Sequence, residues 1–386
     1  MKRLSICYLL LLCFSCQMKE RPLMYQMKET NDSLDFNISS ESTTFIKSMS
    51  IFEDGDNTCF AYLNNDENIL YVYDIQTQRL IKEILFQQEG PDGTGPKAAG
   101  FYMQDWDSIY IPNIYVPEIS VIDSCGRKSV SFKLDSLNKG YNFIPTRSVI
   151  NFPFLLIGEH LYGLQLPNPM LGEEVKSKSP VELRLDLKNM KSEPLPFHYP
   201  STVMRNHGKP QLGIETNVSR CFNGEVLVYS FAFDDNLYVV SLEGKVLDVQ
   251  NVKSRYVDNV SLPDNVSPDM QTAVRKMCEL PFYGNIIYDK YRKVYYRIVY
   301  PQTEYNNVEN FVDMWQFGRS LFSIMILDED FNAVGETLFP ENEFRSDLMF
   351  VLEDGLYISS SHYKNPIYDE DRLVFKRFVL EKSNSN

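Results

Sequence analysis

The stretch DWDSIYI at residues 105–111 contains the pattern that predicts the fold. Its polar first half is typical of a turn, and its β-branched and aromatic second half is typical of a strand. The run ISVI at residues 119–122 follows, and the turn DSCG at residues 123–126 leads to the returning run SVSF at residues 129–132. Residues 100–132 therefore predict one unit of antiparallel strands joined by short polar turns.

The same order of turns and strands recurs along the chain in further copies. They lie at residues 60–86, 154–187, 222–245, 284–327 and 352–380. Six units of about fifty residues suit a β-propeller, whose blades are four-stranded sheets that bury their faces against their neighbours. We therefore predict an all-β fold with a six-bladed β-propeller at residues 34–386. Seven blades or tandem β-sandwiches are the alternatives.

Two of these copies differ from the others. The copy at residues 154–187 is the most diverged, and its strands are predicted at residues 156–164 and 181–187. The last copy is predicted to use both ends of the chain. Residues 34–38 alternate between apolar and polar side chains, and we expect them to pair with residues 375–380, so that ring closure removes an exposed sheet edge.

One short helix is predicted to interrupt the strands. Ser267 can cap it, Pro268 suits the first helical position, and Asp269 suits the positive end of the helix dipole. The apolar residues that share one face of this helix are Met270, Ala273, Val274 and Met277. Pro281 ends the helix, which we expect to pack on the propeller as part of a loop.

The N-terminus resembles that of a bacterial lipoprotein. A short cationic start and an apolar core of about ten residues are typical of a secretory signal, whereas a membrane span needs about twenty. The ending CFSC at residues 13–16 resembles the lipobox, which implies acylation of Cys16. We predict a signal peptide at residues 1–15, a flexible tether at residues 16–33, and a lipid anchor in the outer membrane, on either its periplasmic or its surface face.

Composition excludes one class of partner. The chain has 38 basic and 52 acidic residues and a net charge of −14, which repels phosphate backbones, so we expect no nucleic-acid binding. Export permits disulfides, but the spacing does not choose among the possible pairings, and buried free thiols are the simpler expectation. The cysteines concerned are Cys59, Cys125, Cys221 and Cys278.

A family resemblance emerges from three motifs. They are EGPDG at residues 89–93, the following DSIYI at residues 107–111, and YVYD at residues 71–74. Together they resemble a Bacteroidota lipoprotein family of unknown function, domain of unknown function 4221, which is similar to TolB-like and NHL-like six-bladed propellers. The resemblance implies a fold and a location, and it implies no activity.

Motifs for catalysis or cofactors are weak. The glycines of residues 90–97 invite a phosphate-loop interpretation, but two prolines remove amides and two acidic residues repel phosphate, so a tight turn between blades is expected. Residues 328–332 place oxygens at alternate positions, as a calcium loop does, but Ala333 and Phe339 break the EF-hand pattern. We assign no catalytic residue, no metal site and no cofactor, with calcium as the alternative.

Four residues are candidates for ligand binding. His198 and His207 lie in the diverged middle of the chain, and Tyr305 and Trp315 lie in a long aromatic insertion of the fifth copy. Loops that carry aromatic side chains often form recognition surfaces. Packing within the loops is the structural alternative for these residues.

Two functions are compatible with these features. The first is a monomeric, lipid-anchored propeller in the cell envelope that binds a protein, peptide or glycan, or acts as a scaffold. The alternative is a metal-dependent hydrolase or lactonase with its site in the central channel, which requires acidic, amide or histidine side chains to converge there. The absence of a catalytic motif in the sequence favours the binding module.

Overall fold

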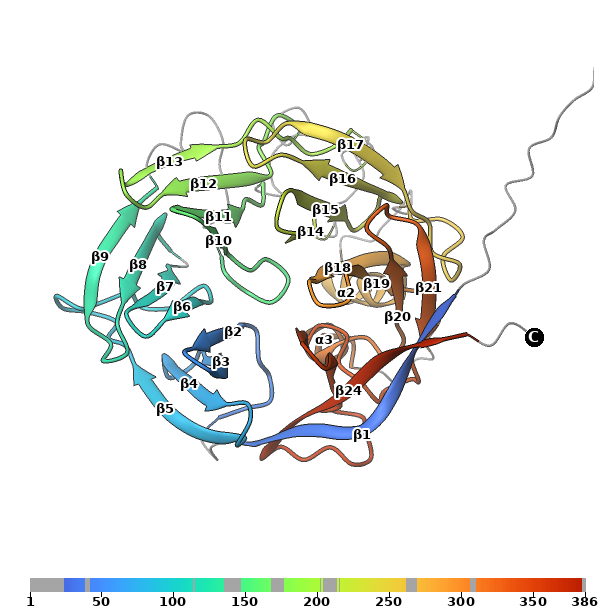
Figure 1. Cartoon of the computed structure of the whole chain (residues 1–386), viewed down its shortest axis with the longest axis horizontal. Helices are drawn as coiled ribbons and strands as arrows, with labels where there is room; N and C mark the ends of the chain where they lie inside the picture. The colour runs from blue at the N-terminus through green and yellow to red at the C-terminus, as the bar shows by residue number, and fades with distance from the viewer. Residues whose placement is uncertain are drawn as a thin grey trace, which may run out of the picture.

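The computed structural model describes residues 24–38, 42–113, 115–134, 147–167, 177–201, 203, 214, 216–261, 269–305 and 310–383. Strands dominate this part of the chain, and the predicted all-β class is confirmed. Figure 1 shows that groups of strands follow one another in chain order around a common centre. The N-terminal and C-terminal strands lie side by side.

Four of the sheets are antiparallel and four-stranded, and each uses consecutive strands. The first contains β2 (Met49–Asp54), β3 (Asn57–Asn64), β4 (Ile69–Asp74) and β5 (Arg79–Leu85). The second contains β6 (Tyr102–Asp105), β7 (Ser108–Pro112), β8 (Glu118–Ile122) and β9 (Lys128–Lys133). The third contains β10 (Leu155–Ile157), β11 (His160–Leu164), β12 (Glu182–Asp186) and β13 (Lys191–Pro194). The fourth contains β14 (Val218–Phe222), β15 (Leu227–Phe231), β16 (Asn236–Val240) and β17 (Val246–Asn251).

The remaining strands form one eight-stranded sheet, in the order β18-β19-β20-β21-β1-β24-β23-β22. One half contains β18 (Phe282–Asp289), β19 (Val294–Tyr300), β20 (Ser323–Leu327) and β21 (Ala333–Leu338). The other half contains β1 (Tyr25–Asn37), β22 (Met349–Leu352), β23 (Gly355–Ser359) and β24 (Arg372–Lys382). The register between β1 and β21 contains the single parallel pair Tyr25↔Gly335. We refer to these two halves and the four separate sheets as the strand groups.

The predicted pairing of the two chain ends is confirmed, and it is longer than expected. β1 runs antiparallel to β24 from Tyr25↔Lys382 to Asn37↔Arg372, and Leu34 faces Phe375. The predicted tether at residues 16–33 is therefore wrong for its second part, because residues 25–33 belong to β1. The polar composition of this segment is typical of a linker, but backbone pairing to β24 holds it in the sheet.

The diverged copy contains one more strand than the sequence predicted. Residues 156–164 form a hairpin of β10 and β11 instead of one strand, with Ile157 opposite His160. Gly158 turns the chain between them at φ 60°, a left-handed conformation that glycine adopts without a side-chain clash. The unit at residues 100–132 has the strands and turns that its sequence predicts, in β6 to β9.

The described residues contain two helices where one was predicted. α2 (Met270–Glu279) is the expected helix, but its N-cap is Asp269, whose side chain accepts a hydrogen bond from the Thr272 amide. The predicted cap Ser267 lies outside the described residues. α3 (Phe311–Phe317) was not predicted, and it begins after the N-cap Asn310. Seven residues are too few for the sequence to show a helical period.

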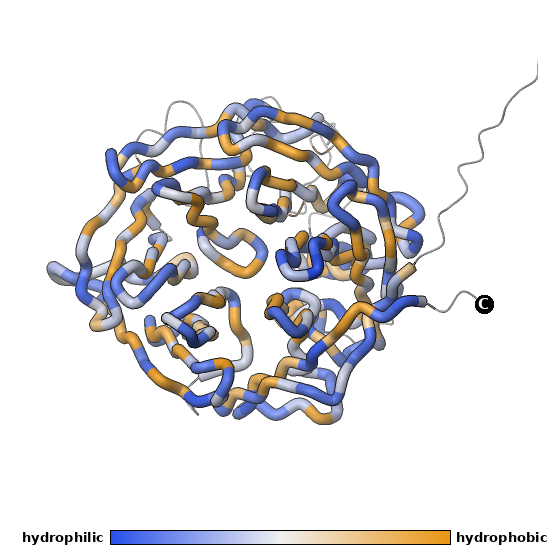
Figure 2. The backbone as a smooth tube through the Cα atoms, in the orientation of Figure 1, coloured by the Kyte–Doolittle hydropathy of each residue, from blue (hydrophilic) through white to orange (hydrophobic). Residues whose placement is uncertain are grey.

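The hydrophobic core is divided into clusters that lie between neighbouring strand groups. Ile84 of β5 and Ile109 of β7 belong to one cluster, Tyr162 of β11 and Leu227 of β15 to another, and the other boundaries are filled in the same way. One cluster lies between the two halves of the eight-stranded sheet and contains Ile324 of β20. Figure 2 shows the alternation of hydrophobic and hydrophilic residues that this packing requires.

Buried charges also join neighbouring groups, and their partners lie within the protein. Arg220 of β14 and Glu182 of β12 form a fully buried ion pair at 2.8 Å, and the Tyr229 hydroxyl donates to the same carboxylate. Arg297 of β19 is also fully buried and donates to the backbone carbonyls of residues 234, 235 and 252. Burial lowers the pKa of Arg297 to about 10.

Candidate functional site

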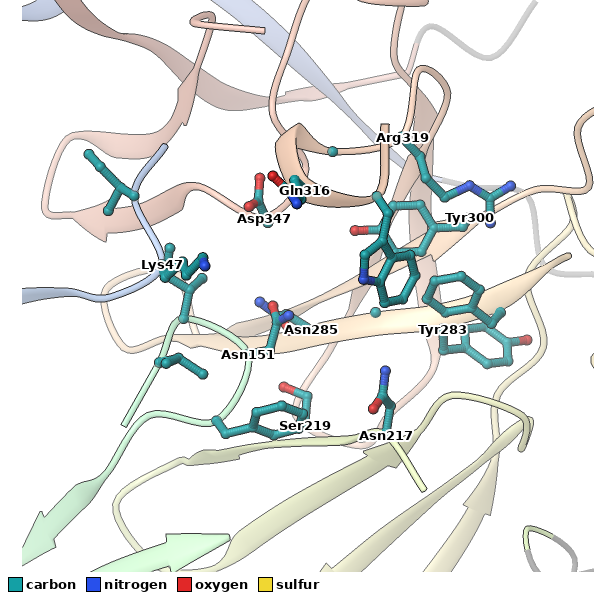
Figure 3. Close-up of a pocket in the computed structure, with 18 of the residues that line it drawn as sticks. Lys47, Asn151, Asn217, Ser219, Tyr283, Asn285, Tyr300, Gln316, Arg319 and Asp347 are labelled. Atoms are coloured by element: carbon teal, nitrogen blue, oxygen red, sulfur yellow. The ribbon is translucent and has the colours of Figure 1, made fainter. Parts of the chain in front are cut away.

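A cavity of about 500 Å³ lies where the first strands of several strand groups converge. Its wall comes from the segments that precede β2, β10 and β22, from the starts of β14 and β18, and from α3. The polar residues of the wall are Lys47, Arg147, Asn151, Asn217, Ser219, Asn285, Gln316, Arg319 and Asp347. Figure 3 shows Lys47 on one side of the cavity and Tyr283, Tyr300 and Arg319 on the other.

A pair of serines organises the side of the cavity that carries Lys47 and Arg147. The Ser48 hydroxyl donates to the Ser148 carbonyl at 2.7 Å, and the Ser148 hydroxyl donates to the Phe101 carbonyl at 2.8 Å. The Ile150 amide donates to the Lys47 carbonyl at 2.9 Å. Lys47 and Arg147 each precede one of these serines, so the same hydrogen bonds hold the backbone of both cations beside the cavity.

The charges of Lys47 and Arg147 are not compensated within the described part of the chain. Neither forms an ion pair with a described carboxylate, and Arg147 Nε is buried without a hydrogen-bond partner. Burial lowers the pKa of both side chains, and the charge of Lys97 lowers that of Lys47 further while Asp66 opposes the change. A base with a lowered pKa gains from a bound anion, which stabilises its charged form.

The other two charged residues of the wall make hydrogen bonds within the protein, although Arg319 Nε, like Arg147 Nε, is buried without a described partner. Arg319 donates to the Leu280 and Pro301 carbonyls, and Figure 3 shows its guanidinium directed away from the other labelled polar side chains. The Asp347 carboxylate accepts two hydrogen bonds from Arg345, the shorter at 2.7 Å. The uncompensated charge of the cavity is therefore positive.

Aromatic side chains form the opposite wall. The Tyr283 hydroxyl donates to Asp235 at 2.6 Å, and the Tyr300 hydroxyl lies 2.9 Å from Ser346 Oγ. Burial raises the pKa of Tyr300 to about 12. In α3, Met314 is buried and Trp315 is 38% exposed, and both residues line the cavity. Trp315 thus offers a free ring surface.

Carboxamides supply most of the neutral polar groups of the cavity. They are Asn151, Asn217, Asn285 and Gln316. Within the described ranges, the side chains of these residues make no hydrogen bond to the protein. Each amide can donate and accept, so together they match a ligand with several hydroxyl groups.

The structure brings only one of the predicted ligand-binding residues into the cavity. That residue is Trp315. His198 is exposed at the margin of the β10–β13 sheet, where it bridges to Pro180, and Tyr305 lies beside α2 with its hydroxyl 2.8 Å from Ser320 Oγ. His198 and Tyr305 therefore lie away from the cavity, and their role in ligand binding stays a prediction. His207 and the lipidation candidate Cys16 lie outside the described residues.

Lys47 and Arg147 are the site residues that sequence reasoning missed. A signal was present, since a cation followed by serine precedes the first strand in two of the copies. The two dipeptides are KS at residues 47–48 and RS at residues 147–148. These dipeptides lie just before the strands, outside the strand and turn pattern that defines each repeat.

The glycine-rich loop at residues 90–97 and the acidic loop at residues 328–332 both have structural roles. Residues 90–97 connect β5 to β6, and Lys128 Nζ donates to the Gly93 carbonyl at 2.6 Å, so the expected turn between sheets is confirmed. Asp328 accepts hydrogen bonds from the amides of Asp330 and Asn332 within the β20–β21 hairpin. All four described cysteines are free thiols, and only Cys125 is exposed.

The residues of the cavity do not fit a divalent cation. Its described wall contains the single carboxylate of Asp347, which Arg345 already binds, together with two uncompensated cations. No group of three or more acidic, histidine or cysteine side chains in the described ranges could hold a metal ion. Among the same residues, no helix has the length and apolar character needed to cross a membrane.

Comparisons with known proteins agree with this fold. Residues 24–338 match the family described as a domain of unknown function (DUF4221). A crystal structure of a DUF4221 family member from Bacteroides vulgatus ATCC 8482 has 24% sequence identity and a TM-score of 0.82, and the match covers 94% of this chain and 100% of that one. A putative exported protein from Bacteroides fragilis NCTC 9343 has 10% identity and a TM-score of 0.52, with 92% and 95% covered. No curated protein matches the chain.

Proposed function

The chain belongs to the DUF4221 family, and on that premise we propose that it is a lipid-anchored binding or scaffold module of the cell envelope. Its ligand is a protein segment, a peptide or a glycan that enters the central cavity. The observation that carries this proposal is the wall of the cavity, where Arg147 Nε is buried without a described partner and the side chains of four carboxamides make no hydrogen bond within the described ranges. A buried donor without a partner, such as Arg147 Nε, costs free energy, which a ligand can offset.

We also propose that the strand groups form a six-bladed propeller of the TolB-like or NHL-like kind. Two features support dividing the eight-stranded sheet into two blades. A single backbone pair joins β1 to β21, and a hydrophobic cluster lies between the two halves as it does at the other boundaries. The last blade then combines β22, β23 and β24 with β1, so pairing of the chain ends closes the ring.

Anchoring through Cys16 places the module close to the outer membrane. β1 begins at Tyr25, and the residues between Cys16 and β1 reach at most about 30 Å when fully extended. The tether is thus shorter than the sequence suggested, and it limits how far the cavity can move from the lipid surface. We expect the chain to act as a monomer there.

The hydrolase alternative receives less support from the residues of the cavity. Metal-assisted hydrolysis requires several oxygen or nitrogen ligands around one ion. The described wall offers three cations and the single carboxylate of Asp347, which Arg345 already binds. A binding role needs only the groups that are present.

A ligand screen tests the proposed function. The mature chain is applied to arrays of envelope glycans and peptides, in parallel with Trp315→Ala and with Lys245→Gln, which alters an exposed residue of the β16–β17 turn. We expect at least one ligand that binds the native chain and the Lys245 variant and is lost with Trp315→Ala. Equal binding by all three proteins, or no retained ligand, contradicts a binding role of the cavity.

The lipid anchor needs a separate test. Growth with a labelled fatty acid should label the native chain and leave Cys16→Ser unlabelled, with the protein moved from the membrane fraction to the soluble one. Membrane association of an unlabelled Cys16→Ser protein would contradict anchoring through this residue.

A further inference from the structure

We propose that the central cavity binds an acidic sugar, whose carboxylate is held by Lys47 and Arg147. The proposal rests on the proposed function of the cavity as a binding site, and it specifies the chemical class of the ligand. Three properties of the cavity lead to it: the sign of the uncompensated charge, the placement of the two cations, and the neutral groups of the remaining wall.

The sign of the charge is unusual for this chain. The protein carries a net charge of −14, yet the described wall of its central cavity contains three cations and the single carboxylate of Asp347. Arg345, outside the wall, already neutralises Asp347. An anion that enters the cavity therefore meets positive charge within a negative protein, which favours its binding.

The two cations are held in place by the backbone. The bond from Ser48 Oγ to the Ser148 carbonyl and the bond from the Ile150 amide to the Lys47 carbonyl join the segments that carry Lys47 and Arg147. Lys47 also lies over the Phe45 ring, with its Nζ 4.6 Å from the ring centroid. Little conformational freedom of the backbone is then lost when an anion binds between these segments.

An arginine that stabilises the fold of this protein has hydrogen-bond acceptors within the chain. Arg297, which is fully buried, donates to three backbone carbonyls and to Ser230 Oγ at distances between 2.7 and 3.0 Å. Arg147 has no such acceptor among the described residues, and its Nε is buried. A guanidinium that only supports the fold would be expected to have carbonyl or carboxylate acceptors, so Arg147 is positioned for an external one.

The neutral part of the wall matches the body of a sugar. Asn151, Asn217, Asn285 and Gln316 supply donors and acceptors for hydroxyl groups, and Trp315 supplies an apolar ring on which a sugar face can pack. The cavity volume of about 500 Å³ falls in the range of small-molecule sites. A carboxylate bound by both cations fixes the orientation of such a ligand.

Calorimetric titration with defined probes tests this inference. The probes are glucuronate, galacturonate and N-acetylneuraminate, with their neutral methyl esters and inorganic sulfate as comparisons. The proteins are the native chain, Lys47→Gln and Arg147→Gln, with Lys245→Gln and Arg79→Gln as matched controls at exposed positions outside the cavity. Thermal unfolding of each variant without ligand shows that it is folded.

We expect at least one sugar acid to bind the native chain and both controls. Its affinity should fall about tenfold or more in Lys47→Gln and in Arg147→Gln. The neutral methyl ester should bind the native chain more weakly than the acid by a similar factor. Sulfate binding as tight as that of the sugar acid would overturn the sugar assignment. A neutral methyl ester that binds the native chain as tightly as the acid would overturn the role of the cations while leaving the proposed binding function intact. Failure of every sugar acid to bind also overturns the inference, whereas the array screen decides the binding function separately.

Discussion

Arg220 lies at a boundary between two sheets, and Arg147 lies in the wall of the central cavity. The two arginines differ in their hydrogen-bond partners. Arg220 is fully buried and donates to both oxygens of Glu182 and to the carbonyls of Pro153 and Tyr162. Arg147 is half-buried, and within the described chain its Nε has no acceptor. Arg220 thus stabilises the boundary between two sheets, whereas Arg147 Nε can still donate to a ligand.

This contrast distinguishes arginines that stabilise the fold from arginines that can bind a ligand. Burying a charge costs free energy unless it is paired and hydrogen-bonded, so a folding role and a missing partner rarely coincide. Arg297 follows Arg220 in this respect, whereas Lys47 is an exposed side chain in the wall of the cavity. Four measurements test the distinction between Arg220 and Arg147.

The largest effect is expected from Glu182→Gln. The change leaves the buried guanidinium of Arg220 without its counter-charge, and we expect the free energy of unfolding to fall by about 3–5 kcal/mol. Urea denaturation measures this loss. A loss below about 1 kcal/mol would show that the ion pair does not support the boundary between β12 and β14, and it would remove the contrast with Arg147.

A buried histidine near the cavity should make stability depend on pH. Burial lowers the pKa of His362 to about 4, from 6.5, and Arg345 and Lys364 act in the same direction while the Gly318 carbonyl and Asp347 oppose it. Between these values the unfolded chain binds a proton that the folded chain does not. The contribution of His362 to the free energy of unfolding is therefore fully present above about pH 6.5. It falls by about 3 kcal/mol as the pH decreases to about 4.

Denaturation at several pH values checks this expectation. His362→Gln cannot titrate, so its stability should change less between pH 6.5 and 4 than that of the native chain. Parallel curves for the two proteins would show that His362 is not the group responsible. The histidine would then resemble Arg147, with a charged form that the fold tolerates.

Arg147→Met should have a smaller effect on stability, with the opposite sign to Glu182→Gln. The change removes an uncompensated guanidinium, so we expect the free energy of unfolding to stay constant or to rise by up to about 1 kcal/mol. Urea denaturation beside the Glu182 variant makes the comparison direct. A loss of several kcal/mol would place Arg147 among the structural arginines and contradict its availability to a ligand.

The smallest effect is expected from Arg184→Gln. Arg184 pairs with Glu193 on the outer part of the β10–β13 sheet, and the exposed fractions of the two side chains are 24% and 58%. Solvent screens this pair, so we expect a change in unfolding free energy of less than about 1 kcal/mol. A loss as large as that of Glu182→Gln would show that the number of partners, and not burial, decides the contribution.

Much of the fold could be derived from short-range patterns. The strands and turns of residues 100–132, the pairing of the chain ends and the helix before Pro281 all follow from alternation, turn residues and helix-ending signals. The errors arose where pattern and composition conflict. Residues 25–33 are polar yet form part of β1, because a partner strand from the other end of the chain supplies their hydrogen bonds.

The candidate site could be predicted from the sequence only in part. Trp315 could be proposed because aromatic loop residues stand out in a sequence, whereas His198 and Tyr305 have the same local character and lie elsewhere. Aromatic character is a property of one residue. Membership of a cavity is a property of several segments at once.

Local chemistry therefore accounts for the repeated strand units, since alternation and turn preference act over a few neighbouring residues. Tertiary structure alone decided that Lys47 and Arg147, far apart along the chain, would lie beside one cavity with their charges uncompensated. The physical reason is that hydrogen bonds between distant segments, such as Ser48 to Ser148, set which side chains meet, and residue order does not encode those bonds locally.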